Sequence, residues 1–145
     1  MTNFATIKCE LSSTNPAAEL ETEVWLGDTK IFDGRIIEPR HIEYRFNDDE
    51  DRVHELKFVL KNKNDSHTVL DHAGNIVKDS TIKIENLKFD DIELGHLFYQ
   101  LANYHHNRNG HGEWANTKFF GEMGCNGTVT FKFTTPVYLW LLENM

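Results

Sequence analysis

The sequence has few of the features that mark a membrane protein or a disulfide-rich protein. Its 145 residues include only two cysteines and three prolines. No apolar stretch approaches the ~18 residues needed to span a bilayer. Residues 1–6 contain neither a basic region nor an apolar run, so no signal peptide is indicated. We therefore expect a soluble protein of a reducing compartment, without a transmembrane segment or membrane insertion.

Positive charge is also scarce. The formal net charge is −8 at pH 7, which disfavours nucleic acid and anionic membrane surfaces as partners. The charge is uneven along the chain, because residues 96–145 contain three basic and three acidic side chains. The same segment holds 10 of the 17 aromatic residues and four of the eight histidines. Surface chemistry is therefore expected in this last third.

Apolar and polar residues alternate with a period of two in several segments, which is typical of strands with one buried face. In residues 128–134, Val129, Phe131 and Phe133 share one face. The length fits a single domain, residues 1–145. We predict a mainly β fold, an antiparallel, jelly-roll-like β-sandwich with one short amphipathic helix. The expected strands cover residues 4–11, 23–26, 30–37, 41–46, 53–60, 81–87, 88–94, 128–134 and 137–142.

The predicted helix lies in residues 91–106. Its apolar residues recur at helical spacing, and Asp90 or Asp91 can cap its start. Gly95 early in the segment disfavours a helix, so another strand pair stays open. The residues that form the stripe are Leu94, Leu97, Phe98, Leu101 and His105.

The last predicted strand, residues 137–142, is apolar on both phases of the alternation. Such a strand is either covered on both faces or lies at an interface. We therefore predict a subunit contact through Tyr138, Trp140 and Leu142. The alternative is a central strand hidden beneath the helix.

The segment from Tyr104 to Trp114 gathers the most polar and aromatic chemistry. An aromatic ring can stack on a sugar ring, while amide and imidazole groups bind its hydroxyls. A tryptophan buried in the core is the competing interpretation of Trp114. The predicted ligand-binding residues are Tyr104, His105, Asn107, Asn109, His111 and Trp114.

The same segment allows a transition-metal site, with His105 or His106 joined by His111 and Glu113. Its spacing matches neither HExxH nor the HxH-plus-Glu arrangement of cupins, and an exposed polar loop is the simpler explanation of the histidines. The acidic residues 47–51 can offer oxygen ligands to Ca²⁺, although they fail the EF-hand pattern. No cofactor is therefore expected, with calcium left open.

Catalytic machinery is sparse in the sequence. Cys125 lies in the glycine-rich stretch 124–127, but no base is placed beside it by the sequence. The stretch 121–127 lacks the lysine and the following helix of a phosphate-binding loop. We therefore expect a non-enzymatic protein.

Two families resemble parts of the chain. Residues 54–58, 79–84 and 89–92 (HELKF, DSTIKI and FDDI) resemble jelly-roll carbohydrate-binding modules, which implies glycan binding assisted by Ca²⁺. Residues 123–129 and 136–143 (MGCNGTV and PVYLWLLE) are similar to small proteins of tailed bacteriophages. The second resemblance implies a viral origin and a place in the virion or in the cytoplasm of the host cell.

The leading interpretation is a structural or interaction protein of a phage particle that forms a homo-oligomer or binds other virion proteins. The alternative is a carbohydrate-binding module that recognises a glycan through the Tyr104–Trp114 segment. A metal-dependent enzyme that uses the histidines of this segment is a further alternative. The β-sandwich itself cannot decide among them, because one fold hosts many functions.

Overall fold

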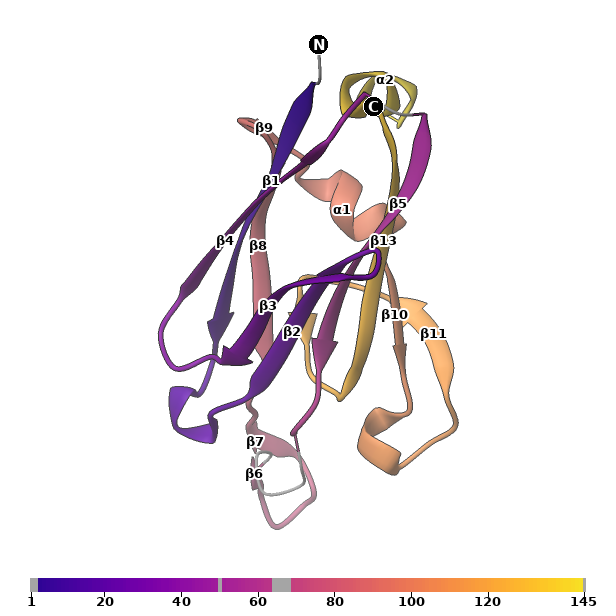
Figure 1. Cartoon of the computed structure of the whole chain (residues 1–145). Helices are drawn as coiled ribbons and strands as arrows, with labels where there is room; N and C mark the ends of the chain where they lie inside the picture. The colour runs from indigo at the N-terminus through magenta and orange to yellow at the C-terminus, as the bar shows by residue number, and fades with distance from the viewer. Residues whose placement is uncertain (1–2, 50, 64–68, 145) are drawn as a thin grey trace.

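A computed structural model describes residues 3–49, 51–63 and 69–144. Two antiparallel sheets face each other and form the predicted β-sandwich (Figure 1). The first sheet has the order β12-β8-β1-β4, with β9 beside β8. Its strands are β12 (Glu122–Met123), β8 (Ile82–Phe89), β1 (Phe4–Ser13), β4 (Arg40–Asn47) and β9 (Ile92–Glu93).

The second sheet has six strands in the order β11-β10-β13-β5-β2-β3. They are β11 (Ala115–Lys118), β10 (Asn103–His106), β13 (Gly127–Thr135), β5 (Arg52–Leu60), β2 (Glu21–Leu26) and β3 (Thr29–Arg35). A small hairpin, β6 (Val69–Leu70) and β7 (Ile76–Lys78), extends from the end of the sandwich opposite the two chain termini (Figure 1).

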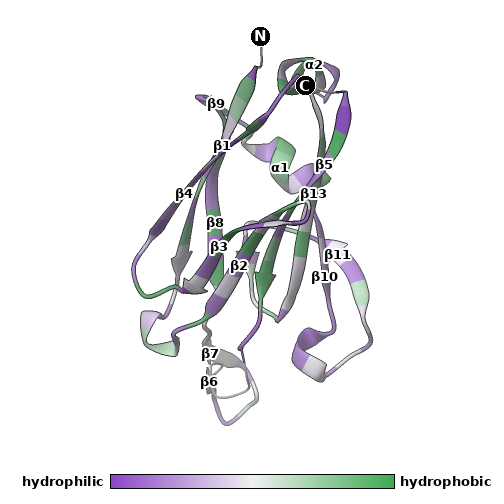
Figure 2. Cartoon of the chain, in the orientation of Figure 1, coloured by the Kyte–Doolittle hydropathy of each residue, from purple (hydrophilic) through white to green (hydrophobic). Residues whose placement is uncertain are grey.

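The core lies between the sheets, where the alternation predicts it. Val129, Phe131 and Phe133 of β13 are buried, as are Leu56 and Phe58 of β5. The register places Val129 beside Phe58 and Phe131 beside Leu56, so both strands direct the same phase inward. Green and purple alternate along the strands in Figure 2, which follows from this arrangement. Cys9 is buried in the same core, and both cysteines are free thiols.

The predicted amphipathic helix in residues 91–106 is present but shorter than the segment that its apolar spacing indicates. Helix α1 (His96–Leu101) covers only six of these residues, and Asn103–His106 form β10. Gly95 has a φ of 55° and Ala102 is extended, so the backbone leaves the helical region at both ends. Phe98 of α1 contacts Phe58 and Phe131 across the core. The long apolar stripe therefore combines a helix turn with a strand.

The prediction of a final strand over residues 137–142 is wrong, because Val137–Asn144 form helix α2. Its buried residues, Val137, Trp140 and Leu141, are spaced as one face of a helix. Trp140 packs against Phe89 of the first sheet and Phe133 of the second. Helix α2 thus closes one end of the sandwich, close to both termini (Figure 1).

Candidate functional site

Tyr104 faces the interior, although the sequence predicts it as a ligand-binding residue. Its side chain is 6% exposed. The hydroxyl accepts a hydrogen bond from Cys125 N at 2.9 Å and donates one to Cys125 O. Burial raises the pKa of the Tyr104 phenol. Because the ring lies in the core, it is not available to stack on a bound sugar, and its contacts instead join β10 to the loop before β13.

Asn107 and Asn109 hold the loop that follows β10. Asn107 Oδ1 accepts a hydrogen bond from Gly110 N at 3.0 Å, which closes the short 3₁₀ turn η3 (Arg108–Gly110). Asn109 Oδ1 accepts one from Asn126 N at 2.8 Å. Side-chain amides that bond to backbone groups shape a turn, because they replace the missing backbone partner. The structure therefore gives these two predicted site residues a role in positioning the loop.

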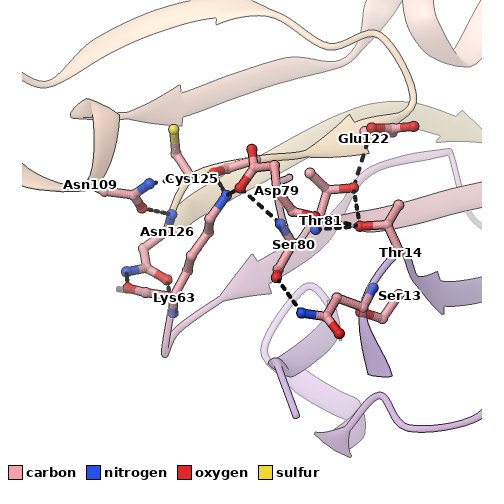
Figure 3. A network of polar contacts seen from close by, with 12 residues as sticks. Ser13, Thr14, Lys63, Asp79, Ser80, Thr81, Asn109, Glu122, Cys125 and Asn126 are labelled. Carbon is pink, nitrogen blue, oxygen red and sulfur yellow. Dashed lines mark hydrogen bonds and ion pairs between the residues drawn. The ribbon is translucent and has the colours of Figure 1, made fainter. Parts of the chain in front are cut away.

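A buried lysine anchors the same loop from the opposite side, and no pattern in the sequence indicates it. The Lys63 side chain is 1% exposed, and its Nζ lies 2.6 Å from Asp79 Oδ1 (Figure 3). Nζ also donates a hydrogen bond to Gly124 O at 2.5 Å. Asn126 bonds the Lys63 backbone through both amide atoms, at 2.7 and 2.6 Å. This loop anchor, made by Lys63, Asp79, Asn109 and Asn126, fixes residues 107–127 onto the end of the sandwich.

His105 and Trp114 lie on the outer surface and stack on each other. Their ring centroids are 5.1 Å apart and their planes differ by 17°. Trp114 is 60% exposed, so the interpretation of Trp114 as a core residue is wrong. His105 Nδ1 lies 2.9 Å from Asn116 Oδ1, which also accepts from Asn103 Nδ2 at 3.0 Å. His105 and the two amides form one edge of a groove, with Trp114 stacked on His105.

This groove, the outer groove, has a volume of about 650 Å³ and crosses the outer face of the six-stranded sheet. Register places Trp25 beside Lys57, Lys57 beside Thr130, and Thr130 beside Asn103. Because the row runs across five strands from β2 to β11, it is about 19 Å long at the usual strand spacing. The residues that line the groove are Trp25, Gly27, Asp28, Lys57, Val59, Asn103, His105, Asn116, Thr128 and Thr130.

A second hollow of about 530 Å³ continues the outer groove along the sheet. The two hollows share Lys57, Asn103 and Thr130, and the second adds Glu55 and Lys132. Lys57, Val59, Thr128 and Thr130 occupy the middle of the groove, whereas Trp25 lies on one side and the stacked His105 on the other. The arrangement can accept an elongated ligand lying across the strands.

The histidines do not converge on a common point. His105 faces Trp114, whereas His106 lies against Tyr104 with ring centroids 4.5 Å apart. His106 Nδ1 accepts a hydrogen bond from Arg108 N at 3.0 Å. Burial, with smaller contributions from Arg108 and His105, lowers the pKa of His106. Over the described residues, no group of three His, Cys, Asp or Glu side chains is arranged to hold a metal ion, so the predicted set with His111 and Glu113 is not assembled.

The acidic residues 47–51, considered as a calcium loop, instead close the end of the sandwich. Asp48 Oδ1 accepts a hydrogen bond from Val137 N at 2.8 Å, at the start of α2. Asp49 Oδ1 accepts one from Asn3 N at 2.8 Å. Residue 50 lies outside the described residues. These carboxylates stabilise the N-terminus of α2 and the first strand.

The predicted interface residues fall on the two faces of α2. Trp140 is 6% exposed and belongs to the core, whereas Tyr138 is 50% and Leu142 is 76% exposed. The hydroxyl of Tyr138 donates a hydrogen bond to Asp90 Oδ2 at 3.0 Å. A contact through Trp140 would require α2 to leave the sandwich, so only Tyr138 and Leu142 remain available to a partner.

Cys125 lies beside the loop anchor and is partly buried. Burial raises the pKa of its thiol. Its backbone N–H and C=O both bond the Tyr104 hydroxyl. A raised pKa disfavours the thiolate form that a nucleophilic cysteine needs.

Comparison with known proteins supports the fold class. The chain matches no family model and no curated protein. It is similar to a solved structure described as "vCBM60 in complex with galactobiose", with a TM-score of 0.50. The alignment covers 87% of this chain and 96% of that one at 10% sequence identity. This likeness establishes the β-sandwich fold, and nothing among the matches supports a phage origin. No helix in the described ranges has the length and apolarity to cross a membrane.

Proposed function

We propose that this protein is a glycan-binding module and that the outer groove of the six-stranded sheet is its binding site. The observation that carries the proposal is the placement of aromatic groups on both sides of a hollow lined with hydroxyl and amide groups. Trp25 on β2 and His105 on β10 both line the groove, and Trp114, just before β11, supports His105 by stacking on it. The similarity to a carbohydrate-binding module supports the same function.

The two amides at the groove have unused hydrogen-bonding capacity. Asn103 Nδ2 and His105 Nδ1 both approach Asn116 Oδ1. Among the described residues, no partner is found for Asn103 Oδ1 or Asn116 Nδ2. Asn103 Oδ1 thus remains as an acceptor and Asn116 Nδ2 as a donor at the groove wall. Two neighbouring sugar hydroxyls can bind to such a pair, because each hydroxyl both donates and accepts hydrogen bonds. Thr128 and Thr130 add hydroxyl groups to the groove.

Intrinsic tryptophan fluorescence during titration with a glycan panel that includes galactobiose tests the proposal. Binding should change the emission of Trp25 and Trp114, while Trp140, on the buried face of α2, serves as an internal reference. Trp25→Ala should weaken binding by about 1 kcal/mol, the usual contribution of one aromatic stack, and Trp114→Ala should weaken it less, because Trp114 acts through the stacked His105. Phe120→Ala is the matched control, because Phe120 is 78% exposed and lies outside the outer groove. Unchanged affinity in both tryptophan variants would reject the site.

Self-assembly through α2 is a second candidate function. It is favoured by the exposure of Tyr138, Leu139 and Leu142, at 50%, 57% and 76%, on one short helix. Light scattering after size exclusion should then give a mass above 16.9 kDa. Leu139→Ser combined with Leu142→Ser should return the monomer without loss of the fold. A monomeric wild-type protein would reject this function and leave the glycan site untouched.

A further inference from the structure

Positive charge gathers at the junction of the outer groove and the second hollow, in an otherwise acidic protein. The outward positions of β5, β13, β10 and β11 carry three lysines, Lys57, Lys118 and Lys132, and one carboxylate, Glu55. The whole chain has a net charge of −8. Lys57 lines both hollows, Lys132 lines the second hollow, and Lys118 lies beside Asn103 at the end of the row.

Two of these lysines share the single carboxylate. Lys57 Nζ lies 3.4 Å from Glu55 Oε2, and Lys132 Nζ lies 3.6 Å from Glu55 Oε1. One carboxylate between two ammonium groups leaves about one positive charge at the junction of the two hollows. The Lys132 side chain is 66% exposed, so a ligand can reach it.

The neighbouring half of the same sheet is different. On β2 and β3, Lys30 lies near Glu23 and Asp33, and Lys61 lies near the same two carboxylates. Arg35 is likewise close to Glu19 and Glu21. Each cation there has at least two carboxylate neighbours, and three cations face four carboxylates in all, so no positive charge is left over. The positive excess lies instead on β5, β13 and β11, away from Asp28 at the other end of the outer groove.

We infer that the ligand of the outer groove is a glycan chain bearing carboxylates, that is, a chain containing uronic acids. This inference rests on the proposed function and deepens it. Glu55 already shows how Lys57 and Lys132 hold a carboxylate across the strands. A sugar carboxylate at the junction would neutralise the remaining positive charge, while Trp25 and His105 contact the rings. The continuous pair of hollows suits an extended chain rather than a single sugar.

A single-stranded nucleic acid would also combine negative charge with stacking bases. The groove favours the glycan, because Asp28 lies at its other end and Glu55 lies at its centre. Closely spaced phosphates would meet both carboxylates, whereas carboxylates on a sugar chain are more widely separated. The overall charge of −8 further opposes a polyphosphate backbone.

The test compares polygalacturonate and alginate with methyl-esterified polygalacturonate and neutral galactan, using the fluorescence titration. Esterification removes the charge and keeps the chain, so it is the matched ligand control. The uronate chains should bind up to about fivefold more tightly, because an exposed ion pair contributes up to about 1 kcal/mol. Added salt should remove the preference. Lys57→Met and Lys132→Met should also remove it, whereas Lys83→Met, on β8 of the opposite sheet, should leave it unchanged.

The outcomes separate the inference from the proposed function. Equal affinity for the ester and the acid, or for galactan and both uronates, would overturn the inference and leave glycan binding in place. Binding of a single-stranded oligonucleotide more tightly than either uronate would overturn it in favour of nucleic acid. No response to any glycan of the panel would reject both proposals. Circular dichroism spectra of the lysine variants exclude misfolding as the cause of a loss.

Discussion

The two sides of the β10–β11 hairpin use the same residue types for different purposes. On the inner side, Asn109 and Asn126 bond backbone groups and belong to the loop anchor with Lys63. On the outer side, Asn103 and Asn116 bond each other and line the outer groove. Both sides are polar and both come from the same third of the chain, so composition alone does not distinguish them.

The difference lies in what the amides bond. An amide that donates to and accepts from the backbone fixes the path of the chain, and its capacity is used. An amide whose oxygen bonds only neighbouring side chains keeps capacity for a ligand. Residue type thus indicates polarity, whereas the partner indicates whether a residue shapes the fold or can bind.

The largest expected effect comes from a change that disrupts both sides together. A Cβ on Gly127 would lie 2.3 Å from His105 O and 2.8 Å from His106 Cβ. Gly127→Ala must therefore push β10 away from β13, and we expect a loss of about 3 kcal/mol in the free energy of unfolding together with weaker glycan binding. Urea denaturation measures the first effect and the fluorescence titration the second.

Gly112→Ala is the control for this variant, because a Cβ there lies 3.5 Å from Arg108 Cδ, which is ordinary contact. Its stability should stay within about 0.5 kcal/mol of the wild type. Equal stability of the two alanine variants would show that β10 tolerates displacement and that the close packing at Gly127 is unimportant.

An intermediate effect on stability is expected at the loop anchor and not at the outer groove. Lys63→Met removes the ammonium that bonds Asp79 and Gly124 and leaves both acceptors without it. We expect a loss of about 2 kcal/mol in the free energy of unfolding, which is below the cost at a fully buried pair because the Asp79 side chain is 29% exposed. Lys57→Met should change stability little, because its partner Glu55 is exposed. Denaturant midpoints that fall equally in the two variants would contradict the division between anchor and groove.

The smallest expected effect on stability concerns His106, whose ring lies against Tyr104 on the inner side of the hairpin. Its pKa is lowered in the folded protein, so the unfolded chain binds the proton more readily. The stability it contributes is complete above the ordinary value of 6.5 and is lost as the pH falls through the lower folded-state pKa. Protonation of Nδ1 would also break the hydrogen bond from Arg108 N.

The difference in stability between about pH 7 and about pH 5 should therefore shrink in His106→Asn, as measured by urea denaturation. His41→Asn, on the exposed face of β4, is the control and should behave as the wild type. An NMR titration in which His106 gains its proton above the ordinary value would contradict the expected sign.

Much of the fold follows from local sequence. The alternation of Val129, Phe131 and Phe133 predicts β13 because a strand in a sandwich has one dry face. The same approach fails for α2, where Val137, Trp140 and Leu141 have helical spacing while exposed Leu139 and Leu142 make both strand phases apolar. Periodicity alone cannot separate these cases in a six-residue apolar run.

The sequence predicts only part of the candidate site. His105 and Trp114 lie nine positions apart, so their combination is apparent from one segment. Trp25, Lys57 and Thr130 are distant in the sequence, and only strand register brings them beside Asn103. Register is determined by pairing between remote segments, and no pattern within one segment reports it.

The direction of the outer groove has a consequence for how its preference can change. Because the groove crosses the strands, successive positions along it belong to five different strands, with Trp25, Lys57, Thr130, Asn103 and Lys118 in one row. Each of these side chains points away from the core, so one can be exchanged without repacking the interior. A combinatorial library over the row would therefore sample new ligand preferences on an unchanged scaffold, with neighbouring positions varied together because cross-strand pairs interact.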